Sequence, residues 1–242
     1  MSSGRVDAER VARVTVSLRG WERDPQRSLC AQSAAILDVA GVGVALLSGG
    51  QPMGSVCASD TVTGKVEEVQ YTLGEGPAVD ACHEREPVLA PDLAEVTGRW
   101  PGFCNGALAA GIRAASGFPL LVGAICIGSL NLYQTAPGPL REEQHADALA
   151  VAHVVGRMVL GWQSLAPAGE VAWQLEQVPS HRASVHQATG MIAAQTRATI
   201  DDALSLLRAY AFAESRSISD VAGDVVGRRL RFGEGGPLID LA

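Results

Sequence analysis

The sequence predicts an α+β domain with an antiparallel sheet and flanking helices, followed by a small all-α bundle of three helices. Two observations carry this prediction. After residue 181, apolar residues recur at helical spacing in three short segments. Between residues 40 and 135, apolar runs separated by glycine-containing turns are typical of strands. A chain of 242 residues is long enough for two modest domains, each with its own core.

The order of helix and strand signals defines the first domain. Helix, hairpin, loops, hairpin and helix in succession indicate an α+β plan. The expected elements are a helical extension (1–25), a helix after Asp24–Pro25 (26–39), strands joined at Gly49–Gly50 (42–47 and 53–58), loops, a hairpin turning at Val122–Gly123 (118–133) and a long helix (139–162).

This part of the chain resembles the GAF domain, a small sensor fold, over residues 26–164. The resemblance rests on G-V-G-V-A-L-L-S at 41–48, A-S-D at 58–60, Q-Y-T-L-G-E-G-P at 70–77, P-V-L-A-P-D-L at 87–93, W-P at 100–101, and F-P-L…V-G-A-I-C-I-G-S-L-N-L-Y at 118–133. It implies a ligand cavity walled by the sheet and closed by the loops at 70–77 and 92–100.

Five residues of those loops and their surroundings are the candidates for ligand binding: Asp60, Gln70, Glu75, Asp92 and Trp100. The three carboxylates would make the cavity mouth acidic, so a neutral or cationic ligand is expected rather than an anion. Trp100 is expected either as a lid, as a reporter of occupancy or as a plug in the core. The identity of the ligand or cofactor stays open.

The three C-terminal helices have clear start signals. Thr199 and Ser217 stand at N-cap positions, each with an aspartate three residues later. Helices this short are marginal alone, so they are expected to share one core. The predicted stripes are Val185, Ala188 and Ile192 in the first helix, Ile200, Ala203, Leu204, Leu207 and Ala211 in the second, and Ile218, Val221, Ala222 and Val225 in the third.

The residue order of this bundle resembles the ANTAR domain, an RNA-binding module of bacterial antitermination regulators. The matching residues are Ala188 and Gly190, Ala203, Leu207–Arg208, Tyr210–Ala211, and Val221, Ala222, Val225 and Val226. The two halves in this order resemble the GAF- and ANTAR-domain regulators of actinobacteria. The resemblance implies binding to hairpin loops of nascent transcripts, with RNA polymerase affected only indirectly. The family usually carries a lysine where this chain has Thr189, which weakens the expected attraction for phosphate.

The candidate RNA-binding residues combine cations with small and polar groups of the first helix: Arg182, Gln187, Thr189, Gly190, Arg197, Arg208 and Arg216. Arginine would contact phosphates, and glycine would allow close approach of the RNA. Each arginine could equally be a solvated surface charge, and Gly190 could equally serve helix packing. Residues 181–232 contain seven arginines against five acidic residues, whereas residues 1–180 are net acidic.

The change of charge coincides with the expected domain boundary. We expect a linker over 165–170, the ANTAR domain over 171–232 and a flexible tail over 233–242. A homodimer is expected, with the long helix that ends at Trp162 contributing to its seam, and the alternative is that this helix only packs within a monomer. No signal peptide or membrane span is visible, so the cytoplasm is the expected location.

Other functions receive less support from the sequence. Gly74–Pro77 lacks the G-K-[ST] of a phosphate loop, and the histidines lack partners at metal spacing, so neither catalytic nor metal-binding residues are expected. The five scattered cysteines contain no CxxC and are expected as reduced thiols. The alternative function is DNA binding by a helix-turn-helix, but Asp220 and Asp224 would oppose DNA at the start of the last helix.

Overall fold

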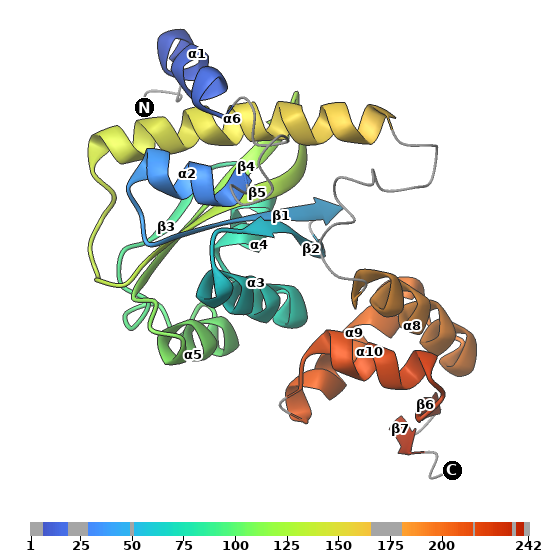
Figure 1. Ribbon diagram of the computed structural model, residues 1–242. Helices are drawn as coiled ribbons and strands as arrows, with labels where there is room; N and C mark the ends of the chain where they lie inside the picture. The colour runs from blue at the N-terminus through green and yellow to red at the C-terminus, as the bar shows by residue number, and fades with distance from the viewer. Residues whose placement is uncertain are drawn as a thin grey trace. The chain divides into compact units, whose positions relative to one another are not determined.

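The computed structural model describes residues 7–18, 29–48, 51–165, 181–214, 216–233 and 236–239. The chain divides into two compact units, one within residues 1–178 and one within 179–242. Figure 1 shows the first in blue to yellow and the second in orange and red. This confirms the prediction of an α+β domain followed by a helical unit.

A five-stranded antiparallel sheet organises the N-terminal unit, with strand order β2-β1-β5-β4-β3. The strands are β1 (Gly41–Ser48), β2 (Gln51–Ala58), β3 (Val88–Ala90), β4 (Ala114–Val122) and β5 (Ile125–Gln134). β1 pairs with the distant β5, so that Gly41 lies opposite Tyr133. Both predicted hairpins are confirmed as β1–β2 and β4–β5. The predicted turn at Gly49–Gly50 lies outside the described residues.

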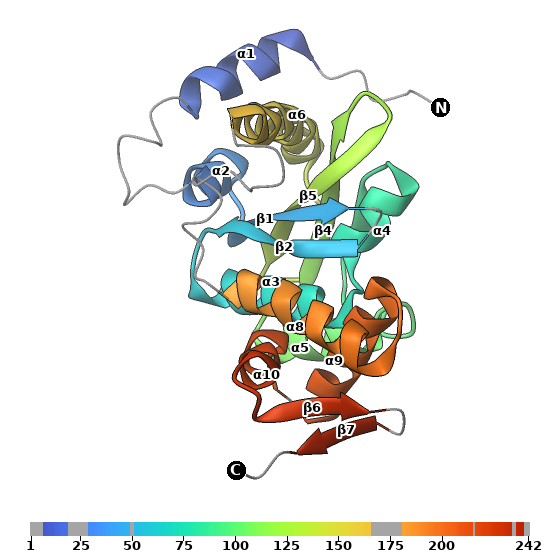
Figure 2. The same cartoon turned by 90° about the vertical axis from the view of Figure 1, so that its right-hand side faces the viewer.

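Helices α1 (Ala8–Ser17), α2 (Leu29–Leu37) and α6 (Glu142–Leu165) lie on one side of this sheet (Figure 2). α2 and α6 pack on apolar strand residues that form the main core: Val42, Val44, Leu46, Val56, Phe118, Leu120, Leu130 and Leu132. α1 lies against α6, where Arg10 and Arg13 each donate to Asp147, at 2.6 and 2.8 Å. The expected N-terminal extension and long helix are therefore present.

Helices α3 (Thr61–Leu73), α4 (Pro77–Glu84) and α5 (Pro101–Ala109) lie on the other side, where only loops were expected. That expectation was wrong because the buried side of α3 carries Thr63, Glu67 and Gln70, which obscure the apolar period. End signals were present in the sequence. Asp60 caps α3, and Gly74 ends it in a left-handed conformation with φ of 68°.

The C-terminal unit contains α8 (His181–Thr196), α9 (Ile200–Ala213) and α10 (Ile218–Val226). The predicted caps are confirmed, since Thr199 accepts from the backbone N–H of Asp202 and Ser217 from that of Asp220. The residues of the predicted stripes are buried with two exceptions, both in α9: Ile200, in the first turn, is 60% exposed, and Leu204 is half-buried.

A short hairpin follows the three helices, made of β6 (Leu230–Gly233) and β7 (Gly236–Ile239). Phe232 is buried, donates its backbone N–H to Gln195 Oε1 at 2.9 Å and packs edge-on against Tyr210. Within the expected tail over 233–242, residues 236–239 form the strand β7. Strands of four residues are too short to give a period in the sequence.

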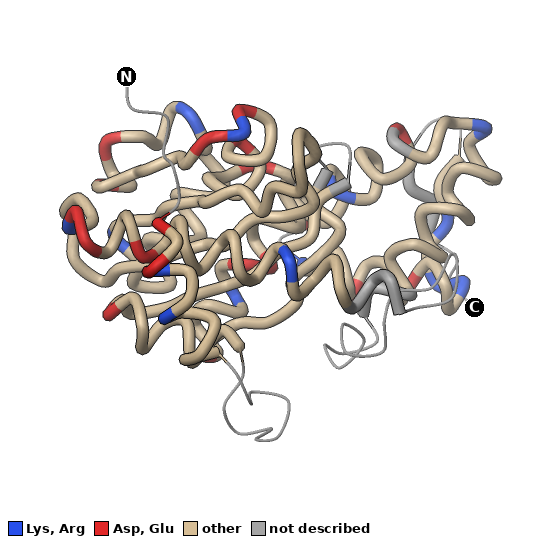
Figure 3. The backbone as a smooth tube through the Cα atoms, turned by 90° about the horizontal axis from the view of Figure 1, so that it is seen from above, with Lys and Arg blue, Asp and Glu red and all other residues tan. Residues whose placement is uncertain are grey.

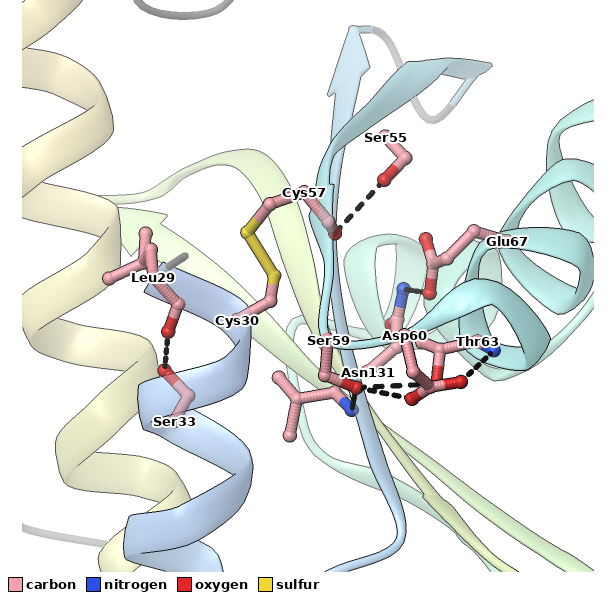
Figure 4. Close-up of a disulfide and its surroundings, with 11 residues drawn as sticks. Leu29, Cys30, Ser33, Ser55, Cys57, Ser59, Asp60, Thr63, Glu67 and Asn131 are labelled. Atoms are coloured by element: carbon pink, nitrogen blue, oxygen red, sulfur yellow. Dashed lines mark hydrogen bonds between the residues drawn. A yellow bond between two sulfur atoms is a disulfide. The ribbon is translucent and has the colours of Figure 1, made fainter. Parts of the chain in front are cut away.

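Four cysteines form disulfides, which corrects the expectation of reduced thiols. Cys30 of α2 is bonded to Cys57 of β2 (Figure 4), and Cys82 of α4 is bonded to Cys126 of β5. The partners are 27 and 44 residues apart in sequence, but the fold brings their Cα atoms to 5.8 and 5.5 Å. Such pairing depends on tertiary structure and has no local sequence signal. Cys104 is free and buried.

The expected linker over 165–170 and the helix expected from 171 lie outside the described residues, apart from Leu165, the last residue of α6. The side chain of Trp162, which was expected at the dimer seam, is likewise outside them. The homodimer and the exact domain boundaries therefore stay predictions.

Candidate functional site

A small cavity lies on the α3 side of the sheet. Its volume is about 10 Å³, close to the room that one water molecule needs. It is enclosed by strands β1 and β2, helix α3 and the first turn of α4. The lining residues are Ala45, Leu47, Pro52, Gly54, Ser55, Glu67, Gln70, Tyr71 and Ala78.

A chain of buried hydrogen bonds forms one wall of this cavity and centres on the carboxylate of Glu67. Glu67 Oε1 accepts from the Tyr133 hydroxyl at 2.6 Å and from Asn131 Nδ2 at 2.8 Å. Gln70 Nε2 donates to the Tyr133 hydroxyl at 2.8 Å, and Gln70 Oε1 accepts from the backbone N–H of Ala78. Glu67 is only 3% exposed. Burial of a carboxylate at this depth requires such donors.

The local sequence explains how these groups meet. Glu67 and Gln70 are three residues apart and share one face of α3. On β5, Ser129, Asn131 and Tyr133 alternate with apolar residues, so all three point toward α3. The sequence reasoning missed Glu67, Asn131 and Tyr133, although this alternation of polar and apolar residues on β5 was a readable signal.

The absence of a side chain at one position of β1 leaves room for the carboxylate of Glu67. A Cβ atom at Gly43 of β1 would overlap the side chain of Glu67, so α3 can carry a glutamate here only because β1 has a glycine. Burial, and after it the neighbouring Glu67, raises the pKa of the Tyr133 hydroxyl well above its ordinary value. Tyr133 therefore remains a neutral donor.

Of the five residues predicted to bind a ligand, Gln70 is the one that lines the cavity. Asp60 instead caps α3, accepting from the backbone N–H groups of Val62 and Thr63 at 2.8 and 2.9 Å. Hydrogen bonds from Ser59 and Thr63 lower the pKa of Asp60 in spite of the opposing effect of its partial burial. Its role here is to start the helix that carries Glu67 and Gln70.

The two other predicted carboxylates also satisfy backbone groups. Glu75 accepts from the N–H of Phe103 at 2.8 Å and so ties the end of α3 to α5. Asp92 accepts from the N–H of Ala94 at 2.9 Å in a surface turn. Neither lines the cavity. The carboxylate that lines the cavity is Glu67, and the acidic mouth stays a prediction.

Trp100 is part of the core, which agrees with the third of its expected roles, a plug. Its ring is 3% exposed and lies edge-on to Phe103 at a centroid distance of 6.1 Å. Its Nε1 donates to Asp80 at 3.0 Å, and the guanidinium of Arg99 lies over the ring. Trp100 is thus a plug that joins α4 to α5.

The predicted RNA-binding residues of the C-terminal unit divide by exposure. Gln187, Gly190, Arg197 and Arg216 are exposed. The side chain of Arg182 lies outside the described residues. Thr189 and Arg208 are buried, and the Thr189 hydroxyl donates to the Val185 carbonyl at 2.7 Å. In this conformation neither Thr189 nor Arg208 presents its polar group at the surface, because both stand on core-facing positions of their helices.

Gly190 lies on the exposed side of α8, and a Cβ atom built there meets no atom within 4 Å. Helix packing therefore does not explain this glycine. Glycine in a helix costs about 1 kcal/mol relative to alanine. Gly223 of α10 lies in the same open space, so the contact expected at Gly190 stays a prediction.

Arg216 is engaged in an ion-pair network. Arg216 and Arg229 donate to opposite oxygens of Asp224, at 2.6 and 2.8 Å. The bond from Arg216, followed by that from Arg229, lowers the pKa of Asp224 against the effect of partial burial. Figure 3 shows basic residues at several places around this unit. Asp220, at the start of α10, is exposed.

No group of three or more histidine, cysteine or acidic residues among the described residues is arranged to hold a metal ion. None of the helices in the described part of the chain combines the length and apolar character that a membrane crossing needs.

Comparison with known proteins matches both units. The profile of the GAF domain matches residues 26–159, more than half of the chain. The profile of the ANTAR domain matches residues 173–226. The chain belongs to the GAF domain family and also carries an ANTAR domain. This arrangement is that of a signal-sensing regulator.

One solved structure agrees with the GAF fold. The GAF domain of an Acinetobacter phosphoenolpyruvate-protein phosphotransferase has a TM-score of 0.50 and 14% identity, with 69% of this chain and 99% of that domain covered. The corresponding domain from Coxiella burnetii has a TM-score of 0.48 and 13% identity, covering 67% of this chain and 98% of the other. No curated protein matches the sequence.

Proposed function

We propose that this protein is an RNA-binding regulator of transcription antitermination that acts in the cytoplasm and catalyses no reaction. The observation that carries the proposal is the order of the two domains in one chain, GAF at 26–159 and ANTAR at 173–226. The ANTAR unit binds hairpin loops of nascent transcripts, and RNA polymerase responds only indirectly. The GAF unit adjusts this binding to a signal.

The RNA-binding surface of the proposal centres on the exposed side of α8 and its C-terminal end. It contains Gln187, Gly190 and Arg197, all exposed. Gly190 leaves open space in which a base or the sugar-phosphate backbone can approach the helix. Arg197 supplies a cation for phosphate, and Arg216 a second one that Asp224 holds in place. Thr189 and Arg208 contribute to this surface only by supporting the helices beneath it.

The ligand of the GAF unit is a small neutral or cationic molecule that reaches Glu67 and Gln70. The cavity has room for about one water molecule, so a larger ligand requires α3, α4 or β2 to move. Such movement is what a sensor needs, because a ligand acts only through different affinities for two states. The long helix α6 is the element that leads from the GAF sheet toward the expected linker. In the proposed homodimer it also contributes to the contact between the two subunits.

RNA binding is tested with the full-length chain and RNA hairpins with exposed loops. We expect Gly190→Leu to weaken binding while the melting temperature stays nearly unchanged. Gly223→Leu is the matched control, since Gly223 also lies in a helix with no atom within 4 Å of an added Cβ. Equal affinity of both variants and the wild type would contradict the proposed surface. Duplex DNA of the same sequence is the second ligand, and preference for it would favour the helix-turn-helix alternative.

The arginines are tested by salt dependence. Arg197→Gln and Arg216→Gln should each reduce the slope of log affinity against log salt concentration by about 0.7–0.9, the value for one phosphate contact. Unchanged slopes for both would place the RNA elsewhere on the unit.

A further inference from the structure

The disulfide between Cys82 and Cys126 lies close to the cavity wall and close to the surface. Cys82 is in the last turns of α4, and Cys126 is the second residue of β5. Cys82 is buried, whereas Cys126 is half-buried and follows Ile125, which is 68% exposed. Of the two cysteines, Cys126 is therefore the one nearer to solvent, and it is the side from which a small thiol would reach the bond.

The surroundings can accept these two cysteines in the reduced state as well. Cys126 Sγ lies 3.1 Å from the carbonyl oxygen of Gly128, to which a thiol at this position donates a hydrogen bond. Cys82 packs among Ala45, Leu47 and Val79, where a thiol behaves as a small apolar group. Breaking the bond therefore leaves neither sulfur in an unfavourable environment.

The bond also fixes one end of a helix that borders the cavity. The first turn of α4 is held by the hydrogen bond from the Ala78 N–H to Gln70. Its later turns are bonded to β5 through Cys82 and to the segment before α5 through the contacts of Asp80 and Glu84 with Arg99 and Trp100. Ala45 and Leu47, which pack with Cys82, line the cavity too. Reduction releases α4 from β5 at one end and leaves the Gln70 contact in place.

We propose that Cys82 and Cys126 form a reversible redox switch that exchanges with low-molecular-weight thiols and alters the mobility of the cavity wall. A thiolate of the reductant attacks Cys126 Sγ, the bond between the two protein sulfurs breaks, and Cys82 leaves with the electron pair and takes a proton from water. A second reductant thiolate attacks the reductant sulfur of the mixed disulfide, which releases the oxidised reductant and a Cys126 thiolate that is then protonated. Oxidised reductant reverses both steps.

The Cys30–Cys57 bond is the natural comparison. Both bonds join a buried cysteine to a half-buried one, but Cys30 belongs to the main core, whereas Cys82 belongs to a cluster of only four buried residues. Cys30 has no exposed surface and belongs to the main core between α2 and the sheet. Its partner Cys57 is half-buried on β2 (Figure 4). Exposed disulfides are the ones that exchange, whereas buried bonds resist reduction. We assign a structural role to Cys30–Cys57.

Cytoplasmic disulfides are usually transient or redox-sensing, which agrees with a switch at Cys82–Cys126. The cytoplasmic location in this argument rests on the proposed function. The buried Cys104 does not take part, since burial, and to a lesser degree Glu75, raises the pKa of its thiol and lowers its reactivity.

The test uses the folded, full-length protein equilibrated with glutathione at a series of reduced-to-oxidised ratios. Free thiols are then trapped by alkylation at low pH and assigned to peptides by mass spectrometry. We expect Cys82 and Cys126 to become alkylated together, at a ratio where Cys30 and Cys57 are still bonded, and to re-form their bond on return to oxidised glutathione. Cys82 and Cys126 that stay bonded until the protein unfolds, or that are reduced only together with Cys30 and Cys57, would overturn the proposal.

Hydrogen exchange on the same samples tests the effect on the cavity wall. Reduction should speed amide exchange in residues 77–84 and 125–134 and leave residues 101–109 of α5 unchanged. Cys126→Ser should show the faster exchange without reductant, whereas Cys57→Ser should not change residues 77–84. Equal exchange of the oxidised and reduced wild type in residues 77–84 would refute the coupling. None of these measurements involves RNA, so they stand or fall independently of the ANTAR proposal.

Discussion

The two units place their polar groups in opposite ways. In the N-terminal unit, the polar groups nearest the cavity are inside, because Glu67, Asn131 and Tyr133 are all buried in one hydrogen-bonded chain. In the C-terminal unit the core is formed mainly by apolar residues, with Thr189 and Arg208 also buried, and Gln187 and Arg197 lie outside. A buried site favours a small ligand that can be enclosed, whereas an exposed helix surface favours a macromolecule. Each unit is therefore suited to a different class of partner.

The largest expected effect tests the apolar interior of the C-terminal unit. Ile192 of α8 is fully buried at the centre of the three helices. Ile192→Ala should lower the free energy of unfolding of this unit by about 3 kcal/mol, because it removes apolar contacts and leaves a cavity. Hydrogen exchange should show the loss of protection within residues 181–232.

Ile200→Ala is the matched control for this variant, since the same side chain is removed from a position that is 60% exposed. Its effect should stay within about 0.5 kcal/mol, as for most surface substitutions. A similar loss for both variants would show that the bundle is not held together by the core described here.

A second test addresses the polar interior of the N-terminal unit. Glu67→Ala leaves Asn131 Nδ2 and the Tyr133 hydroxyl without their shared acceptor in a buried region. The expected loss of stability is about 2–3 kcal/mol, measured by denaturant unfolding. Glu67→Gln keeps an acceptor oxygen and the size of the side chain, so it should lose less. Equal losses would mean that side-chain volume, rather than hydrogen bonding, is what Glu67 contributes.

The same contrast explains which parts could be predicted from sequence. The three C-terminal helices depend on contacts three or four residues apart, so the caps at Thr199 and Ser217 and most of the apolar stripes were readable. The N-terminal site depends on pairs far apart in the chain: Glu67 with Tyr133, and Cys82 with Cys126. A single sequence contains no direct signal for such pairs.

The candidate ligand residues show the same limitation. Asp60, Glu75 and Asp92 were expected at the mouth of the cavity that the family resemblance implies, and in the structure all three accept hydrogen bonds from backbone N–H groups. Carboxylates next to turns commonly have this role. Gln70, which was expected in a loop, lies in α3 and lines the cavity, and its role in ligand binding stays a prediction.

A third test measures how the stability of the protein depends on pH, which reports on the buried Tyr133. The pKa of Tyr133 is raised in the folded state. Its contribution to the free energy of unfolding is therefore complete at a pH below 10, the ordinary pKa of tyrosine, and is lost as the pH rises above 10. For one such proton the stability falls by about 1.4 kcal/mol per pH unit above that point. Tyr133→Phe should be less stable near neutral pH but should lose stability less steeply above pH 10. Identical slopes for the variant and the wild type would contradict this assignment.

The smallest expected effect concerns Gly190 and bears on the outer surface of the C-terminal unit. Because a Cβ atom at Gly190 meets nothing within 4 Å, Gly190→Ala should raise the free energy of unfolding by about 0.5–1 kcal/mol through the backbone alone. Gly223→Ala in α10 meets the same open space and should give a similar gain. Substitutions of the two glycines should differ only in their effect on RNA affinity. The larger side chain of Gly190→Leu should weaken hairpin binding, whereas Gly223→Leu should not. If Gly190→Ala destabilises the unit instead, the glycine supports the fold, and the exposed side of α8 loses its main reason to be assigned to RNA.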